Sequence, residues 1–92
     1  MSEYIEIETE TSDDGKRLFV FTNLRLAEGA IEDYNSRESL EEGSPVAQAL
    51  AMIDGISQLR IEDSDLIITR ESEVEWYVIV EELSIALKDF FL

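Results

Sequence analysis

The chain of 92 residues contains no cysteine and no histidine. Without a thiolate or an imidazole it can form no disulfide, no Cys-His or Ser-His nucleophile pair, and no Cys/His site for zinc or an iron–sulfur cluster. These absences exclude most familiar enzyme classes. We therefore predict that the chain is not an enzyme and that it holds no metal ion and no other cofactor.

Basic residues are also scarce. Seven Lys and Arg residues stand against 22 Asp and Glu residues, which gives a formal net charge of −15 and a pI of about 4.1. This charge repels phosphate backbones and anionic membranes, so we expect no nucleic-acid partner and no membrane partner. A charged partner should be a basic protein. Alternatively, the excess of acid serves only to keep the chain soluble, for example in a salty cytoplasm.

Long apolar runs are missing as well. No segment approaches the ~20 apolar residues that span a bilayer, and residues 1–6 lack the basic and apolar regions of a signal peptide. These features favour a cytoplasmic location. A hydrophobic content of 45% and a single proline are ordinary for a folded domain, so we expect residues 1–92 to form one small domain. A monomer is the oligomeric state that we favour.

The first third of the chain predicts a β-hairpin. Isoleucine and threonine alternate with glutamate over Tyr4–Thr9, which is the period of a strand with one dry face. A polar turn at residues 11–15 follows, where Gly15 can adopt a positive φ. Arg17–Thr22 is rich in β-branched and aromatic residues and supplies the returning strand. Its apolar residues on both faces indicate a more central place in the sheet than that of the first strand.

Residues 23–43 carry weaker signals, and order returns at Ser44. Gly29–Tyr34 is compatible with a short edge strand, and Ser36–Glu42 with a helical turn that Leu40 anchors. Ser44 followed by Pro45 predicts the start of a helix, because serine caps free N–H groups and proline suits the first helical position.

Apolar spacing extends this helix. Its expected buried positions share one face and are Val46, Ala49, Leu50 and Ile53. Gly55 suits the left-handed residue that ends a helix. Beyond it, Leu59 and Ile61 alternate with polar residues, Glu62–Asp65 forms a turn, and Leu66–Thr69 completes a second hairpin. The isoleucines of the last strand indicate that it is well buried.

The C-terminal residues predict a long helix. Ser72 followed three residues later by Glu75 has the pattern of a capping box. Beyond the box runs an apolar stripe at helical spacing, formed by Trp76, Ile79, Val80, Leu83, Leu87 and Phe90. Tyr77–Val80 also has strand propensity, so a strand is the alternative there.

The order of these elements, β-β-β-α-β-β-α, predicts a single small α+β domain. We expect a mainly antiparallel or mixed sheet of four to five strands, with two helices packed on one face.

Four segments of the second half resemble the N-terminal domain of the Nfu/NifU family of iron–sulfur scaffold proteins. That domain shows a Ser-Pro-Leu-Ala helix start, an Ile-Pro-Gly-Val turn, a Gly-x-Asp-Phe-Ile-Thr-Val-Thr strand and a Glu-Trp pair that opens its last helix. The corresponding segments here are Ser44-Pro45-Val46-Ala47, Ile53-Asp54-Gly55-Ile56, Asp63-Ser64-Asp65-Leu66-Ile67-Ile68-Thr69 and Glu75-Trp76. The first hairpin matches loosely, because the two prolines that the family carries there are absent from residues 11–19.

The resemblance implies a role in iron–sulfur cluster assembly and gives a set of candidate positions. These family motif positions are Ser44, Pro45, Ala47, Gly55, Asp65, Thr69, Glu75 and Trp76. In full-length members a separate C-terminal domain holds the cluster through a Cys-x-x-Cys pair, which this chain lacks. Iron binding is therefore a property of the family and is not expected of these residues.

Local structure explains the remaining candidates more simply than chemistry does. Trp76 could anchor a partner, but an indole at the head of an apolar stripe favours the core. Glu75 is interpreted as a capping residue, and Ser44, Ser64 and Ser72 have no base that would activate them. The acidic turns at residues 13–15 and 62–65 lack the spacing of a calcium loop, which favours solvated turns.

Three hypotheses of function follow. The preferred one is a noncatalytic interaction module, accessory to iron–sulfur cluster assembly or delivery, whose partner is an assembly protein or a cluster-containing client. The second is an acidic adaptor or decoy that binds a basic protein. The third is an enzyme that uses carboxylates alone, for which so small a domain offers little volume for a substrate cleft.

Overall fold

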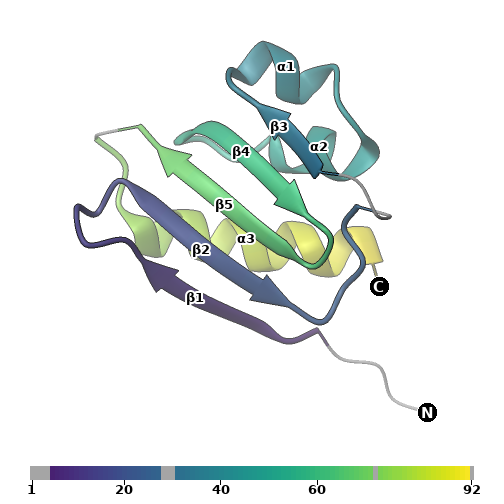
Figure 1. The fold of residues 1–92 in the computed structure, drawn as a ribbon, viewed down its shortest axis with the longest axis horizontal. Helices are drawn as coiled ribbons and strands as arrows, with labels where there is room; N and C mark the ends of the chain where they lie inside the picture. The colour runs from purple at the N-terminus through teal and green to yellow at the C-terminus, as the bar shows by residue number, and fades with distance from the viewer. Residues whose placement is uncertain (1–4, 28–30, 72, 92) are drawn as a thin grey trace.

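The computed structural model describes residues 5–27, 31–71 and 73–91 of the chain. They form one β-sheet with helices on one side of it, as Figure 1 shows. In chain order the elements are β1 (Ile7–Thr11), β2 (Arg17–Thr22), β3 (Ile31–Tyr34), α1 (Arg37–Glu41), α2 (Pro45–Leu50), β4 (Ile56–Glu62), β5 (Asp65–Arg70) and α3 (Trp76–Phe91).

The sheet has five strands in the order β1-β2-β5-β4-β3, and every neighbouring pair is antiparallel. The prediction of an α+β domain is confirmed, and of the two alternatives for the sheet the antiparallel one is correct. β2 lies between β1 and β5, which confirms its predicted inner position. β5 joins the two hairpins, because it pairs with β2 on one side and with β4 on the other.

The first strand lies further along the chain than the alternation predicted. β1 begins at Ile7 and continues to Thr11, which pairs with Leu18 of β2. The turn is tighter than expected, since the Ser12 N–H donates to the carbonyl of Arg17 at 2.9 Å and Thr11 remains in the ladder. Gly15 has the predicted positive φ, at 73°. Tyr4 lies outside the described residues.

The described part of the chain contains three helices where the prediction counted two. The additional helix is α1, which corresponds to the expected helical turn at Ser36–Glu42. The Ser36 hydroxyl caps it by accepting a hydrogen bond from the Ser39 N–H at 3.2 Å, and Leu40 is fully buried. Local capping therefore suffices to form a short helix beside the β3 edge of the sheet, where Figure 1 shows it.

α2 begins as predicted but ends earlier. Ser44 is its N-cap and Pro45 its first residue, whereas its last residue is Leu50. Gly55 therefore does not end the helix, although its φ of 100° is positive as expected. A side chain at Gly55 would bring a Cβ within 2.6 Å of the Cγ1 of Val74, so glycine is required there by a close approach as well as by its φ.

α3 confirms the helix prediction against the strand alternative. It begins at Trp76, and the carbonyl of Glu75 accepts hydrogen bonds from the N–H groups of Val78 at 3.2 Å and Ile79 at 3.4 Å. A cap at Ser72 would make Glu73 the first helical residue, so the predicted capping box is wrong. Ser72 itself lies outside the described residues.

The hydrophobic core fills the space between the sheet and the helices. Ile79, Leu83 and Leu87 of α3 are at most 1% exposed and confirm the apolar stripe, whereas Phe90 is 43% exposed and does not belong to it. The sheet contributes alternate residues of its three inner strands, which are Leu18, Val20, Leu59, Ile61, Leu66 and Ile68. Among the described residues, the helices pack on one face of the sheet.

Candidate functional site

The family motif positions at the start of α2 build the helix itself. The Ser44 hydroxyl accepts a hydrogen bond from the Ala47 N–H at 3.3 Å, and the Ser44 N–H donates to the Tyr34 hydroxyl at 3.1 Å. Pro45 occupies the first helical position, and Ala47 is fully buried in the core. These residues fix the place of α2 beside β3, and none of them offers a reactive group to solvent.

A second group of motif positions lies where α3 meets the first hairpin. The indole N–H of Trp76 donates to the carbonyl of Gly15 at 2.8 Å, and the guanidinium carbon of Arg70 lies 5.1 Å from the centre of the indole ring. The carbonyl of Thr69 accepts a hydrogen bond from the Ser57 hydroxyl at 3.0 Å. Trp76 therefore holds α3 to the β1–β2 turn and packs against the core, as the sequence favoured.

Three motif positions remain. Asp65 is the first residue of β5 and lies at the other end of that strand from Arg70. The motif positions therefore do not converge on one site. Gly55 and Glu75 act through their backbones. Gly55 adopts a positive φ, and the carbonyl of Glu75 accepts hydrogen bonds from the first turn of α3. The family motif positions therefore mark the framework of the fold.

The acidic turns are occupied by their own hydrogen bonds. The carboxylate of Asp14 accepts from the Ser12 hydroxyl at 2.7 Å and from the Lys16 N–H at 3.0 Å, and these two bonds lower the pKa of Asp14 below its ordinary value. At the other turn, Glu62 pairs with Arg60 at 2.6 Å. Within residues 5–27, 31–71 and 73–91, no group of three or more acidic side chains is arranged to hold a metal ion.

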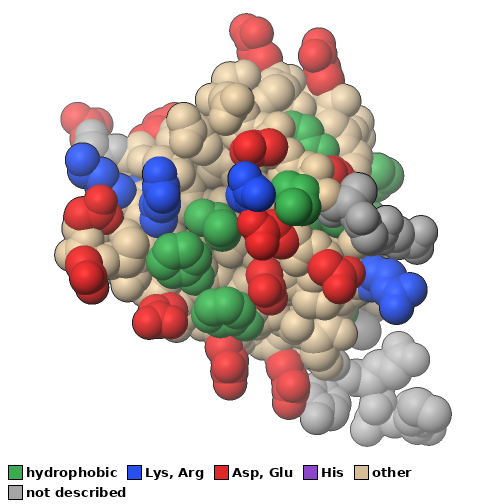
Figure 2. Space-filling model, viewed as in Figure 1, with side chains coloured by type: hydrophobic (Ala, Val, Ile, Leu, Met, Phe, Trp, Pro, Cys, Tyr) green, Lys and Arg blue, Asp and Glu red, His purple; other side chains and the backbone are tan. Residues whose placement is uncertain are grey.

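The face of the sheet opposite α3 carries an apolar patch. Phe19 of β2 pairs with Ile67 of β5, and Phe21, two residues further along β2, is 42% exposed. We name these three residues the open-face patch. Figure 2 shows hydrophobic side chains gathered over the middle of this face with acidic side chains around them.

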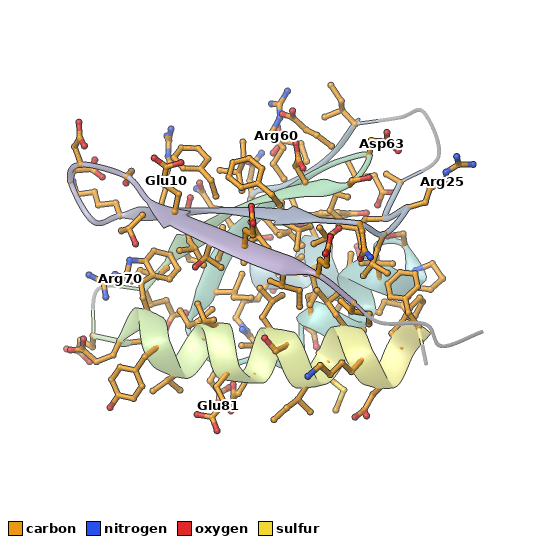
Figure 3. The ribbon with its side chains drawn as sticks, turned by 90° about the horizontal axis from the view of Figure 1, so that it is seen from below. Glu10, Arg25, Arg60, Asp63, Arg70 and Glu81 are labelled. Carbon is orange, nitrogen blue, oxygen red and sulfur yellow. The ribbon has the colours of Figure 1, made fainter. Side chains whose placement is uncertain are left out.

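Both signs of charge border the open-face patch. Glu8 and Glu10 of β1 lie opposite Phe21 and Phe19. On the other side, Arg60 of β4 lies opposite Ile67, and Figure 3 shows Glu10 and Arg60 on the side of the sheet away from α3. Arg60 is paired with two carboxylates, so its positive charge is largely neutralised by its neighbours.

A second apolar surface is the groove between α2 and α3, with a volume of about 520 Å³. Three of its hydrophobic side chains are well exposed, namely Met52 at 85%, Ile85 at 55% and Phe90 at 43%. Its charged lining residues, Glu82 and Asp89, are both acidic. We name this hollow the α2–α3 groove.

The loop that presents Met52 to the groove is held by Arg37. The Arg37 guanidinium donates to the carbonyls of Ala51 and Ile53, the residues on either side of Met52, the second at 3.0 Å. A third bond of 3.4 Å reaches the carbonyl of Ile56 at the start of β4. The backbone around Met52 is thus fixed from α1, although the side chain points into solvent.

The sequence interpretation missed both surfaces. Phe19 and Phe21 were used only to predict the strand and its inner place in the sheet, and Met52 and Ile85 fell outside the predicted stripes of their helices. The sequence held one signal for the groove. Met52 and Ile85 are large apolar residues on the polar faces of the predicted amphipathic helices, where packing in the core does not account for them. Arg37 was missed because the carbonyls that it contacts lie far from it along the chain.

These features define a small α+β domain with an antiparallel sheet, helices on one face and two uncovered apolar surfaces. A sequence model of the family described as "Scaffold protein Nfu/NifU N terminal" matches residues 5–92, and the chain therefore belongs to this family. Family membership supports a role related to iron–sulfur cluster assembly and indicates interaction with proteins of that process.

Among the solved structures that share the fold are the following two. One is the NifU-like protein from Saccharomyces cerevisiae, with a TM-score of 0.71 and 24% identity over 97% of this chain and 82% of that one. The other is protein SAV1430 from Staphylococcus aureus, with a TM-score of 0.71 and 6% identity over 89% of this chain and 98% of that one. No curated protein shows a significant match to the sequence. None of the helices described here is long and apolar enough to cross a bilayer.

Proposed function

We propose that this domain is a noncatalytic docking module that serves iron–sulfur cluster assembly or delivery by contacting another protein. The observation that carries the proposal is membership of the Nfu/NifU N-terminal family in a chain without cysteine or histidine. Such a chain has no thiolate or imidazole with which to ligate a cluster. Its contribution to the process is then the binding of a partner.

The two uncovered surfaces support this proposal. Scattered apolar residues on a protein surface need no explanation, but contiguous ones mark contact sites. The open-face patch and the α2–α3 groove each bring together side chains from two different elements of the fold. The exposed side chains of the two surfaces, among them Phe21, Met52 and Ile85, do not belong to the core and are available to a partner.

Quantitative capture from cells with the tagged full chain tests the proposal. We expect identified cluster-assembly proteins or cluster-containing clients among the partners. Two surface variants, Phe21→Ser on the open-face patch and Ile85→Glu in the groove, should divide these partners by the surface that they use. If no such protein is recovered under conditions in which known scaffolds recover theirs, the proposal is wrong.

The second candidate function is an acidic adaptor that binds a basic protein outside cluster assembly. The net charge of −15 favours it, because a field of that sign attracts basic partners and accelerates their association. Binding of this kind weakens steeply as salt shortens the range of the electrostatic field. An affinity that does not change with ionic strength would eliminate the adaptor.

Three expectations from the sequence stay predictions within this proposal. They are the absence of enzymatic activity, the cytoplasmic location and the monomeric state. A broad activity screen, fluorescence imaging of the tagged full chain and sedimentation velocity would check them in turn.

A further inference from the structure

We infer that the α2–α3 groove binds an amphipathic helix of a partner protein, and that this helix carries basic side chains beside its apolar face. The inference deepens the proposed function and rests on it for the existence of a protein partner. It adds the surface that is used and the chemistry of the segment that fills it.

The groove has an apolar lining of the kind that binds a helix. Apolar helices that bind in grooves place side chains at positions i, i+3, i+4 and i+7 into a hydrophobic channel. Here Ile53, which is 3% exposed, and Ala86 line the groove together with the more exposed Ile85 and Phe90. Val78, 36% exposed, precedes Ile85 by seven positions and therefore lies on the same side of α3.

Val78 and Ile85 are two turns apart on α3, a distance of about 10 Å at 1.5 Å per residue. Phe90, twelve positions after Val78, lies about a third of a turn around the helix from them. Ile85 and Phe90 therefore flank the part of α3 that lines the groove. A bound helix of a few turns can contact these side chains together with Met52.

Charge selects the kind of helix. Glu82 and Asp89 lie seven positions apart on α3 and line the same groove, so they present two carboxylates about two turns apart. A neighbouring hollow shares Met52 with the groove and adds Glu41. Among the described residues, no lysine or arginine lines either hollow. Lys or Arg side chains about seven positions apart on the bound helix match this rim.

The groove is also prepared for binding before a partner arrives. Arg37 fixes the carbonyls on both sides of Met52, so the backbone of that loop is already ordered. The thioether side chain itself is flexible and unbranched, which lets it adapt to the side chains of a partner. A fixed backbone with an adaptable tip lowers the ordering cost of binding.

Another copy of this chain is a poor occupant. In a two-fold symmetric dimer the same surface of both copies meets, so Glu82 and Asp89 would face their own equivalents without a basic residue in the lining. The open-face patch is bordered by Arg60, whose charge two carboxylates offset, whereas the lining of the groove consists of apolar and acidic residues. Charge complementarity thus favours the groove and a basic partner.

A designed peptide tests the inference on the full chain. The probe is a helix-forming peptide of about 18 residues with leucine at the i, i+3, i+4 and i+7 positions and lysines seven positions apart beside them. Amide chemical shifts of the ¹⁵N-labelled protein report where it binds. We expect shifts at Met52, Ile85 and Phe90. Shifts confined to Phe19, Phe21 and Ile67 would overturn the inference.

Matched variants separate the apolar contact from general attraction between opposite charges. Ile85→Glu should weaken peptide binding at least about tenfold, although it adds a negative charge that attracts the peptide. Tyr77→Glu adds the same charge on the same helix, at a residue 71% exposed and outside the groove lining, and should not weaken binding. Equal affinities of the two variants would overturn the groove as the site.

The charge of the rim is tested by neighbouring glutamates. Glu82→Gln should weaken binding about two- to fivefold, as expected for an exposed ion pair. Glu81→Gln should leave the affinity nearly unchanged, because Glu81 points away from the sheet in Figure 3 and does not line the groove. Equal losses from the two would show that only the net charge matters and would overturn the proposed rim.

Peptide and protein controls complete the test. A peptide of the same composition in scrambled order should bind at least about tenfold more weakly, and equal binding would overturn a helix-specific groove. If sedimentation shows a dimer that Ile85→Glu dissociates, the groove is an interface between copies and the inference is wrong. No cluster protein enters these measurements, so their failure is distinct from failure of the capture experiment.

Discussion

The two faces of the sheet use the same strands for opposite purposes. On the face toward the helices, Leu66 and Ile68 of β5 are fully buried. Between them in sequence, Ile67 points to the other face and remains in partial contact with solvent beside Phe19. One strand thus supplies the centre of the core and the centre of an exposed patch.

The comparison teaches that burial, rather than residue type, separates stability from recognition in this domain. Full burial of an isoleucine or leucine side chain contributes about 1.5–3 kcal/mol to folding. A half-exposed side chain of the same type contributes less and retains apolar area for a partner. Substitutions on the two faces should therefore have different consequences.

The largest difference is expected between neighbours on β5. Ile68→Ala should lower the free energy of unfolding by about 2–5 kcal/mol, because it leaves a cavity in the core. Ile67→Ala, one residue away on the open face, should lower it by less than about 1.5 kcal/mol. Urea unfolding followed by tryptophan fluorescence measures both. Equal losses would show that the two faces are not distinct in stability.

The next largest effect concerns two glycines with a positive φ, of which Gly55 lies against a side chain and Gly15 faces open space. Gly55→Ala should cost about 1–3 kcal/mol, because the new Cβ meets Val74 at a positive φ. Gly15→Ala should cost only about 1 kcal/mol, since its φ is also positive but the nearest atom would be 3.9 Å away on Arg70. Thermal unfolding of the two variants checks the order, and a reversed order would contradict this account of Gly55.

A smaller effect is expected where Trp76 of α3 forms a hydrogen bond with the β1–β2 turn. Trp76→Phe keeps an aromatic ring but removes the N–H that donates to the carbonyl of Gly15, which should cost about 1 kcal/mol. Amide hydrogen exchange of β1 and β2 should rise with this loss. An unchanged exchange rate would mean that the indole serves only as core volume.

On the open face, Phe21→Ser should change the free energy of unfolding by no more than about 0.5 kcal/mol. Phe21 is 42% exposed, and its removal leaves the buried face intact. A larger loss, measured by urea unfolding, would show that the open-face patch contributes to folding. The variant would then be unsuitable for the capture experiment.

The smallest effect concerns the pH dependence of the first hairpin. The pKa of Asp14 is lowered by its hydrogen bonds from Ser12 and Lys16, so the carboxylate form is favoured in the folded state. Its contribution is present above the ordinary pKa and is lost as the pH falls through the lowered value. Asp14→Asn should therefore be slightly less stable than the parent near pH 7 and equal to it in acid. A difference that persists in acid would contradict this assignment.

The alternation of apolar residues predicted the fold well where one face is dry. Arg17–Thr22 was placed correctly, and β4 and β5 contain the residues predicted for the second hairpin. Element ends were less accurate. β1 extends to Thr11 because the turn closes at Ser12. α3 begins after the predicted cap because Val74, which precedes the helix, lies close to Gly55. Contacts between distant segments set both ends.

The candidate surfaces could not be predicted from spacing alone. Met52 and Ile85 lie 33 positions apart, and only the packing of α2 against α3 brings them to one groove. Phe90 was assigned to the core because it fits the helical period, yet it lies at the end of α3 beyond the buried stripe. The family motif positions were recognisable from the family pattern instead, and only some of them, such as Pro45 and Glu75, act within a few residues of themselves.

The outermost strands of the sheet have a consequence for handling the protein. Among the described residues, β1 and β3 each have an unpaired side, and exposed strand borders invite other chains to add to them. Glu8 and Glu10 on β1 and Asp33 on β3 place negative charge along these borders, which opposes the approach of an equally charged copy. Salt screens that repulsion without touching the interior, so dilute salt is the condition in which copies of the protein stay dispersed.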